Sequence, residues 1–538
     1  MLSLTRTPRR PCRSAERAGL RRHAVVVLAS GLLAACAVGP DFVRPAAPAA
    51  AGYAPQPIAA DTASADATQG DAQHFKMGRD IPFAWWSAFQ STKLDYLVQQ
   101  ALRANPDITA AQAALRQAQE YTSAQRGFFY PTVNAEFTPT RQKLAGNAGG
   151  NSPGIQGNGS TISTYQNPSG PPYNGPAYYN FYTAQLNLSY TPDVFGSNRR
   201  QVEALQAQAD TLRYQMEATY ITLASNVVAA AIQEASLRSQ LTATQAYIDQ
   251  NAKAVEILHR QHKVGYAMGI DVANQEAALA QARALLPPLQ KQMEQTHDLL
   301  RALCGNLPNA QLDDDFDLGS LQLPQDLPLS LPATLVEQRP DIRAAEEQLH
   351  AASAQVGVAA AARLPQFTIT AALGGEASEI PQMFKTGGPF WELAGDVVQP
   401  IFDGGTLKHR EHAAEEGLTM ARAQYRSTVI TAFQNVADTL HAIQSDADAL
   451  AATAAAEQAA AKVAAITEKQ HTLGYVNTLT LLNAQESYQQ ALIALVQART
   501  NRLGDTAALF QALGGGWWNR PAQSDAPSPS LSQAGPAQ

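Results

Sequence analysis

Two pairs of histidines are the first residues in the sequence that could do chemistry, as ligands of a metal ion. His259 and His262 are three residues apart, and so are His409 and His412, a spacing that places both members of a pair on one face of a helix. Neither pair has the H-E-x-x-H order of zinc proteases, and solvated helix faces explain them better. No phosphate-binding glycine loop or nucleophile motif stands in a suitable context either. We therefore expect no metal, no cofactor and no enzyme.

Cys36 is the second candidate, for covalent lipid attachment. An arginine-rich head precedes an uncharged run from Ala24 to Ala35, which is typical of a signal peptide and too short to span a bilayer. The run ends in a match to the bacterial lipobox, made of Leu33, Ala34, Ala35 and Cys36. We predict that residues 1–35 are removed and that Cys36 carries a thioether-linked diacylglyceryl group. The alternative is an ordinary secretory signal with an incidental cysteine.

Composition limits the partners. The formal net charge is −7, and no basic patch interleaved with aromatic residues appears, so we expect no nucleic acid. The cysteines are Cys12, Cys36 and Cys304. Cys12 leaves with the signal peptide, so no disulfide framework is expected, and Cys304 fits a small buried residue. Residue 37 is alanine rather than the aspartate that retains lipoproteins in the inner membrane, which favours the outer membrane.

Long helices dominate the middle of the chain. Residues 197–264 contain neither glycine nor proline, and apolar residues recur there with the seven-residue repeat of a supercoiled helix pair. Residues 418–473 are equally free of both breakers. Each interval ends in a glycine turn, KVGYAMG or TLGYVNT. We expect another long helix after each turn.

The two turns belong to an internal duplication. At a constant offset of 209, identical residues recur from Ala252 to Gly305 and from Ala461 to Gly514. Upstream, NPDITAAQAAL matches RPDIRAAEEQL at another offset. A repeat this long is one duplicated half-domain. We therefore divide the chain into the segments 1–35 (signal), 36–84 (acylated N-terminus and linker), 85–312 (first repeat), 313–327 (linker), 328–518 (second repeat) and 519–538 (disordered tail).

Each repeat also contains two segments with strand alternation, at about 131–144, 180–195, 365–377 and 389–403. One face of each is apolar and the other is polar, as in a membrane barrel with a wet lumen. A soluble sandwich with one buried face is the alternative, and the lipoprotein signal favours the barrel. The residues expected to face the lumen are Asn134, Glu136, Gln185, Asn187, Glu392 and Asp396.

The strand count implies an oligomer. An open sheet edge is not tolerated in a bilayer, and one chain supplies too few strands to close a barrel with a lumen. Two chains would give an eight-stranded barrel, which is filled by its own side chains or holds one small ligand. Three chains would give twelve strands and room for a pore, with a mild preference for cations because the inward charges are acidic.

These motifs resemble a known family. The segments WWSAFQSTKLDYLVQQALRANPDITAA, LPATLVEQRPDIRAAEEQL and VVQPIFDGGTLK are similar to signatures of the TolC-like outer membrane efflux proteins, and CAVGPDFVRP resembles their lipoprotein branch. The resemblance implies a mainly α fold with a membrane β-barrel, a homotrimer with a twelve-stranded barrel, and a long α-helical periplasmic tunnel. A mixed equatorial domain, to which residues 313–332 could contribute, is also implied. The implied function is the outer membrane exit duct of a tripartite efflux pump. Its implied partners are a periplasmic adaptor and an inner-membrane transporter, commonly of the resistance-nodulation-division type.

The same resemblance suggests where the duct would close. The helices must converge at the turns, whose tips would contact the adaptor through Gly265, Tyr266, Gly474 and Tyr475. Family members often carry acidic rings shortly after the second turn. The corresponding candidates here are Asp271, Asn274, Thr480 and Asn483. Because Asn483 stands where an aspartate is expected, closure should depend on packing and neutral hydrogen bonds. Asp271 could instead simply begin a helix.

A periplasmic coiled-coil adaptor lipoprotein is the alternative function. It shares the lipobox and the heptads, but it requires one helical hairpin flanked by compact β domains. The duplicated strand pairs and the two hairpin turns therefore favour the duct.

Overall fold

The computed structural model describes residues 37–49, 52–143, 178–312 and 315–521. These residues form two compact units. The first unit comprises residues up to Val43, residues 118–209 and residues 348–421. The second comprises residues 44–117, residues 210–347 and the chain from Arg422 onward. Both units draw on both sequence repeats.

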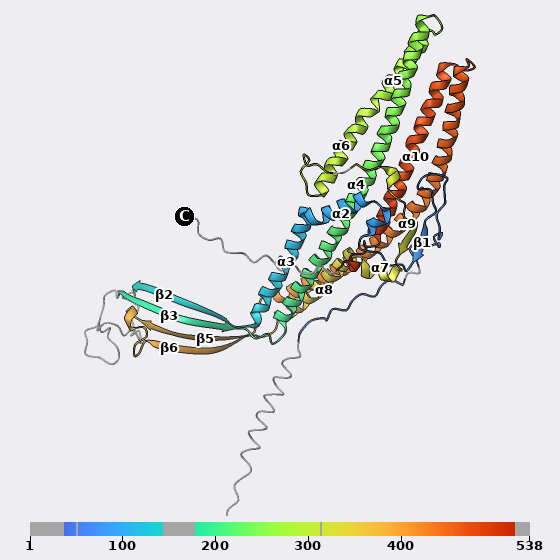
Figure 1. Ribbon diagram of the computed structural model, residues 1–538. Helices are drawn as coiled ribbons and strands as arrows, with labels where there is room; N and C mark the ends of the chain where they lie inside the picture. Colours follow the sequence, from blue (N-terminus) through green and yellow to red (C-terminus); the bar gives the residue numbers. More distant parts are fainter. Residues whose placement is uncertain (1–36, 50–51, 144–177, 313–314, 522–538) are drawn as a thin grey trace, which may run out of the picture. The chain divides into compact units, whose positions relative to one another are not determined.

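The first unit contains one four-stranded antiparallel sheet in the order β2-β3-β5-β6 (Figure 1). Its strands are β2 (Thr132–Lys143), β3 (Tyr178–Tyr190), β5 (Gln366–Ala377) and β6 (Pro389–Val398). β3 and β6 end earlier than the expected limits of 195 and 403. The prolines at 192 and 400 have no N–H to donate to a neighbouring strand, so the ladder stops before them.

Two helices of 67 residues run from the sheet into the second unit, α4 (Ser197–Lys263) and α9 (Thr406–Thr472). At 1.5 Å per residue each spans about 100 Å. The first is followed by α5 (Gly269–Ala284) and α6 (Leu286–Leu303), and the second by α10 (Thr478–Ala512). Figure 1 shows both as helical hairpins.

The prediction of a long helix after each turn is confirmed for the second repeat and wrong for the first. The return helix of the first hairpin breaks at Leu285, and Pro287 and Pro288 open α6. These prolines remove two N–H donors and clash with the preceding turn, so α5 cannot continue. The equivalent residues of α10 are Val496 and Gln497, and there the helix is unbroken.

The remaining helical elements of the described residues are shorter. They are η1 (Trp85–Phe89), α2 (Thr92–Ala104), α3 (Pro106–Arg126), η2 (Gly127–Phe129), η3 (Leu318–Ser320), α7 (Pro332–Gln338), α8 (Pro340–Ala361), η4 (Ile380–Gln382) and η5 (Trp517–Asn519). Within the described residues, no helix is both long enough and apolar enough to cross a bilayer.

The core of the second unit gathers apolar residues from both repeats. Trp85 is buried and stacks on Phe510 with ring centroids 5.2 Å apart. Val227 of α4 and Leu440 of α9 are fully buried in the same cluster. A two-stranded parallel sheet of β1 (His74–Met77) and β4 (Asp326–Leu329) completes this mixed region. The 313–327 segment, expected as a linker, thus leads into a strand.

Residues 53–77 do not behave as a free linker. Arg502 of α10 is fully buried and holds this segment. Its guanidinium donates to the carbonyls of Gln69 (2.9 Å) and Asp71 (2.7 Å) and to Thr62 Oγ1 (3.2 Å). A segment expected as a linker is therefore ordered by a buried cation on another element.

The C-terminal boundary also shifts. Asn519, placed in the expected disordered tail, donates from Nδ2 to Asp80 Oδ2 at 2.8 Å. Arg520 pairs with Glu217 at 2.5 Å and stacks on Tyr220, with its guanidinium carbon 4.0 Å from the ring centroid. These polar contacts fix two residues that composition alone assigns to a tail. The rest of that tail lies outside the described residues.

Candidate functional site

The sheet separates polar from apolar side chains across all four strands. Residues paired across neighbouring strands point to the same face. One such row of paired residues runs through Asn134, Asn187, Ala372 and Glu392. In another row Thr368 pairs with Asp396. Asn187 Nδ2 donates to Glu136 Oε2 at 2.9 Å on that face. The structure therefore brings together all six residues expected to face a lumen: Asn134, Glu136, Gln185, Asn187, Glu392 and Asp396.

The opposite face is apolar and exposed. A single row crosses the sheet through Ala135, Leu186, Leu373 and Trp391. Trp391 is 77% exposed and Leu373 is 62% exposed. Soluble proteins rarely leave so continuous an apolar surface bare. Within the described chain the outer edges of β2 and β6 also have no neighbouring strand. Among the residues that the structure describes, nothing covers the apolar face of this sheet, and neither outer edge has a partner strand.

The two hairpin tips are built alike. Gly265 and Gly474 adopt the left-handed conformation, with φ of 83° and 79°. At the first tip the amide of Tyr266 donates to Gln261 O at 2.8 Å, and at the second Tyr475 donates to Gln470 O at 2.9 Å. This is the Schellman closure of a helix, which favours glycine.

The apolar side chains at both tips point to solvent. Tyr266 is 87% exposed and Tyr475 is 77% exposed. Met268 and Leu473 are also exposed. These four large side chains leave an exposed apolar surface at the end of each hairpin. We call the residues 264–268 and 473–475 the tip surfaces.

The four candidate closure residues lie in the first turns of the return helices. Asp271 is half-buried, and its Oδ2 accepts from the amide of Met268 at 3.3 Å. Asn274, Thr480 and Asn483 are exposed. Among the described residues no hydrogen bond joins these four side chains to one another. Asp271 therefore caps α5, a role that its position alone also suggested.

The residues that follow Cys36 are fixed at the beginning of α4. The amide of Val38 donates to Phe195 O at 3.1 Å. Ala37 lies so close to Gly196 that a Cβ atom on residue 196 would lie only 2.8 Å from the Cα of Ala37. Arg200 pairs with Asp41 at 2.6 Å. Cys36 itself, the lipobox residues Leu33, Ala34 and Ala35, and the rest of the signal lie outside the described residues.

The histidines have local partners. His259 pairs with Glu276 at 2.9 Å, and His262 Nδ1 donates to Ala267 O at 2.9 Å. The rings of His409 and His412 meet edge to face, 6.1 Å apart. These contacts brace the first hairpin tip and the start of α9.

Sequence reasoning missed one cluster of metal-ligand type, Glu234, His297 and Asp315. Arg238 lies between its carboxylates. It donates to Glu234 Oε1 at 2.7 Å and also pairs with Asp315. The guanidinium supplies the positive charge that a metal ion would otherwise bring, so the cluster is an ion-pair network. No sequence motif predicts this cluster, because its three residues come from segments that are far apart in the sequence.

The chain matches the family model described as outer membrane efflux protein over residues 97–306 and 331–515. Relatives include the pyoverdine export outer membrane protein OpmQ of Pseudomonas aeruginosa, 28% identical over 80% of this chain and 87% of that protein. The probable efflux pump outer membrane protein TtgC of Pseudomonas putida is 27% identical over 92% of this chain and 95% of that protein.

Solved structures give the same fold. The outer-membrane channel OprN has a TM-score of 0.75 at 24% identity, covering 90% of this chain and all of that one (100%). The Campylobacter jejuni CmeC outer membrane channel has a TM-score of 0.74 at 22% identity, over 89% of this chain and 95% of that one. The chain therefore shares the fold of these two channels. The chain belongs to the outer membrane efflux protein family.

Proposed function

We propose that three copies of this chain form the exit duct of a tripartite efflux pump in the outer membrane. The observation that carries this proposal is the sheet, which within the described residues has one polar face, one exposed apolar face and two edges without a partner strand. Lipid covers an apolar face, and closure with other copies satisfies the edges. Three copies supply twelve strands, enough for a water-filled lumen lined by Glu136, Glu392 and Asp396.

Native mass spectrometry of the detergent-solubilised protein tests the stoichiometry. We expect a mass of three chains. A monodisperse monomer in mild detergent would refute the proposal.

The lipid anchor is part of this proposal. Residues 37–42 are held at the start of α4, just beyond the end of β3. A lipid on Cys36 would therefore enter the bilayer beside the periplasmic rim of the barrel, and several acyl chains would hold it stably. The intact mass of the mature N-terminal peptide is the test. A peptide that begins at another residue, without lipid mass, would exclude the modification.

The tip surfaces are the proposed contact for a periplasmic adaptor, which would join the duct to an inner-membrane transporter of the resistance-nodulation-division type. Exposed aromatic residues at the two tips suit a partner that caps helical hairpins. Relatives named for pyoverdine export and for efflux pumps support the export of small molecules. Copurification under mild crosslinking, followed by mass spectrometry, would identify the adaptor.

We also propose that the duct closes near Asp271, Asn274, Thr480 and Asn483. Because Asp271 caps α5, Asn483 is the residue best placed to form a neutral constriction by hydrogen bonds between symmetry-related amides. Three aspartates at that place would repel one another or bind a cation. Blockade by trivalent cations from the periplasmic side should therefore be weak, and Asn483→Asp should strengthen it. Strong wild-type blockade unchanged by Asn483→Asp would exclude this closure.

A further inference from the structure

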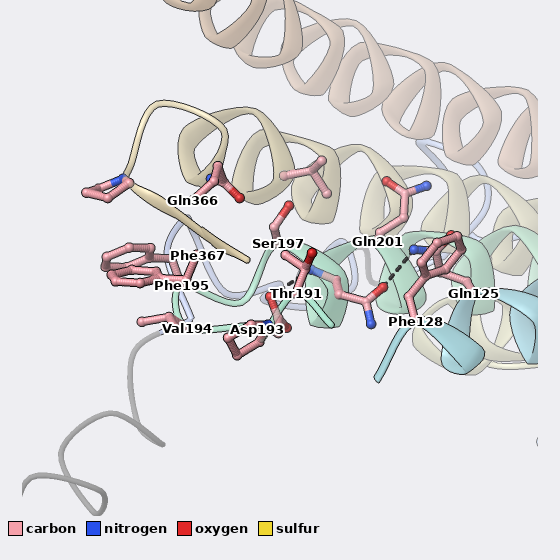
Figure 2. Close-up of a pocket in the computed structure, with 14 residues that line it drawn as sticks. Gln125, Phe128, Thr191, Asp193, Val194, Phe195, Ser197, Gln201, Gln366 and Phe367 are labelled. Atoms are coloured by element: carbon pink, nitrogen blue, oxygen red, sulfur yellow. Dashed lines mark hydrogen bonds between the residues drawn. The ribbon is translucent and has the colours of Figure 1, made fainter. Parts of the chain in front are cut away.

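A cavity of about 320 Å³ lies at the end of the four-stranded sheet, where the strands give way to helices. Its wall comes from α3, α4 and α8, from the chain that follows β3 and from the start of β5, all within the first unit. Figure 2 shows Phe195 and Phe367 together at one end of it and Gln125 and Phe128 at the other. Its volume is at the lower end of the range for ligand pockets, about 300–1,000 Å³.

Several polar groups of the wall are engaged with one another. The carboxylate of Asp193 accepts from the amides of Asn198 (2.9 Å) and Arg199 (2.8 Å), which caps the first turn of α4. Arg199 Nε lies 3.4 Å from the same carboxylate and balances its charge. Gln125 Nε2 donates to Asn198 Oδ1 at 2.7 Å. A polar ligand would have to displace these contacts, so the cavity favours an apolar one.

The aromatic end of the cavity adjoins the apolar face of the sheet. The rings of Phe195 and Phe367 lie 6.3 Å apart. Phe367 precedes Ile369 by two residues on β5, so both side chains point to the same face. That face continues to Leu373 and Trp391, which are paired across β5 and β6. The cavity is therefore adjacent to the surface that lipid covers in the proposed duct.

The segment that follows the proposed lipid-attachment residue is fixed on the same wall. The amide of Val38 donates to the carbonyl of Phe195 at 3.1 Å. Gly39 lies so close to Gly357 of α8 that a Cβ atom on residue 39 would lie only 2.4 Å from the Cα of Gly357. The absence of side chains at this contact lets residues 37–39 lie directly against the helix.

The position of Ala37 determines where the lipid begins. Ala37 packs on Gly196, which directly follows Phe195 of the cavity wall. Residue 36 is bonded to Ala37, and consecutive Cα atoms are about 3.8 Å apart. A lipid on Cys36 therefore starts beside the cavity.

We propose that this cavity binds one acyl chain of the lipid on Cys36, while the other acyl chains enter the bilayer. Cavities with apolar walls hold water poorly and bind apolar groups. The short tether gives this acyl chain a high effective concentration at the cavity, an advantage that a free phospholipid lacks. The bound chain packs between α8 and the start of β5, so the lipid stabilises the junction of helices and strands as well as anchoring the protein. This inference rests on the proposed lipid anchor and names a binding site for it.

Photocrosslinking of the mature, lipidated protein tests the site. p-Benzoylphenylalanine is introduced in place of Phe128 or Phe367 in cells fed an alkyne-labelled fatty acid, and alkyne-bearing peptides are identified by mass spectrometry after irradiation and trypsin digestion. We expect the N-terminal lipopeptide to be joined to the peptide that contains residue 128 or 367. Phe137, which lies on the apolar face outside the cavity wall, is the control position. It should capture the lipopeptide about ten-fold less, because the tether holds the acyl chain at the cavity.

The outcomes separate the site from the anchor. Capture of the lipopeptide from Phe137 as often as from the two cavity positions would overturn the site and leave the anchor intact. Capture of bilayer phospholipid in place of the lipopeptide at the cavity would show that the occupant is another lipid, against the proposal. A mature N-terminal peptide without lipid mass would overturn the anchor and the site together.

Filling the cavity gives a second test. The lipidated wild type should melt at a higher temperature than a Cys36→Ser protein exported behind a cleavable secretory signal, because the bound chain stabilises only the folded state. Val358→Phe enlarges a side chain of the wall and should remove most of this difference. Leu393→Phe, at an exposed position (68%) of the apolar face, should retain it. An equal lipid-dependent shift in both variants would refute the acyl site.

Discussion

The first hairpin, α4 with α5 and α6, and the second, α9 with α10, begin as copies. Their long helices each have 67 residues, and their tips close with the same backbone hydrogen bonds. They differ in the return helix. The first breaks before Pro287, whereas α10 runs from Thr478 to Ala512.

The second hairpin is also tied to the N-terminal segment. Arg502 bonds to Gln69, Asp71 and Thr62. The equivalent residue of the first hairpin is Met293, which is buried without polar contacts of this kind. The two repeats thus keep the same tips but differ in their return helices. The first return helix is interrupted at Leu285, which we call the break. The second binds the N-terminal segment through Arg502, which we call the lock.

Introducing the proline break of the first return helix into α10 should have the largest effect on the stability of the protein. Val496→Pro with Gln497→Pro gives α10 the residues of the first repeat and should destabilise the protein by about 3 kcal/mol or more, because proline inside a helix removes hydrogen bonds and clashes. Thermal unfolding in detergent would measure the loss. Pro287→Val with Pro288→Gln is the matched reverse exchange and should leave the melting temperature equal or higher. Equal destabilisation by both exchanges would mean that the break does not distinguish the hairpins.

Removing the lock should have the next largest effect. Arg502→Met gives the second repeat the residue of the first. It deprives the carbonyls of Gln69 and Asp71 and the buried hydroxyl of Thr62 of a charged donor, at a cost of about 2–3 kcal/mol. Limited proteolysis should then cut within residues 53–77, and the wild type should resist cleavage there. Met293→Leu serves as the control, since it keeps an apolar side chain and should leave that segment protected. If residues 53–77 of the Arg502→Met variant resist the protease as well as those of the wild type, Arg502 does not hold this segment in place.

The tips should respond alike, since they are alike. Tyr266→Ser and Tyr475→Ser should each weaken binding of the adaptor that copurifies with the wild type by about ten-fold, the loss of an exposed aromatic contact of about 1–2 kcal/mol. Surface plasmon resonance would measure it. Tyr96→Ser, at another exposed tyrosine (64%), should bind normally. If only one tip variant weakens binding, the tips are not equivalent.

The smallest effect should be the pH dependence that Asp446 of α9 gives to the second hairpin. Burial, followed by the neighbouring Asp505 carboxyl, raises the pKa of Asp446 to about 7 from 3.8. A raised folded-state pKa means that the folded protein holds a proton that the unfolded chain loses, so stability falls as pH rises from about 4 to about 7. Asp446→Asn should reduce this slope and raise the melting temperature at pH 8 by about 2 °C. An unchanged slope would show that the pair is solvated and uncoupled.

Periodic features were predictable from the sequence. The alternation in β2, β3, β5 and β6 located the sheet and assigned each side chain to a face, because strand geometry has a period of two. The turns at Gly265 and Gly474 followed from glycine at the end of a long apolar repeat.

Contacts between distant segments were not predictable in the same way. The lock at Arg502 joins α10 to residues 62–71, and nothing in the local composition of either segment marks the other. The cluster of Glu234, His297 and Asp315 is similar. Pro287 and Pro288 did carry a local signal, and the expectation of a long return helix overlooked it.

The current through a planar bilayer that contains the purified protein tests the central claim most directly. Three copies with a lumen lined by Glu136, Glu392 and Asp396 should produce discrete current steps with a mild preference for cations. The absence of steps from a preparation that is folded and reconstituted would contradict the claim that this chain builds a channel across the outer membrane.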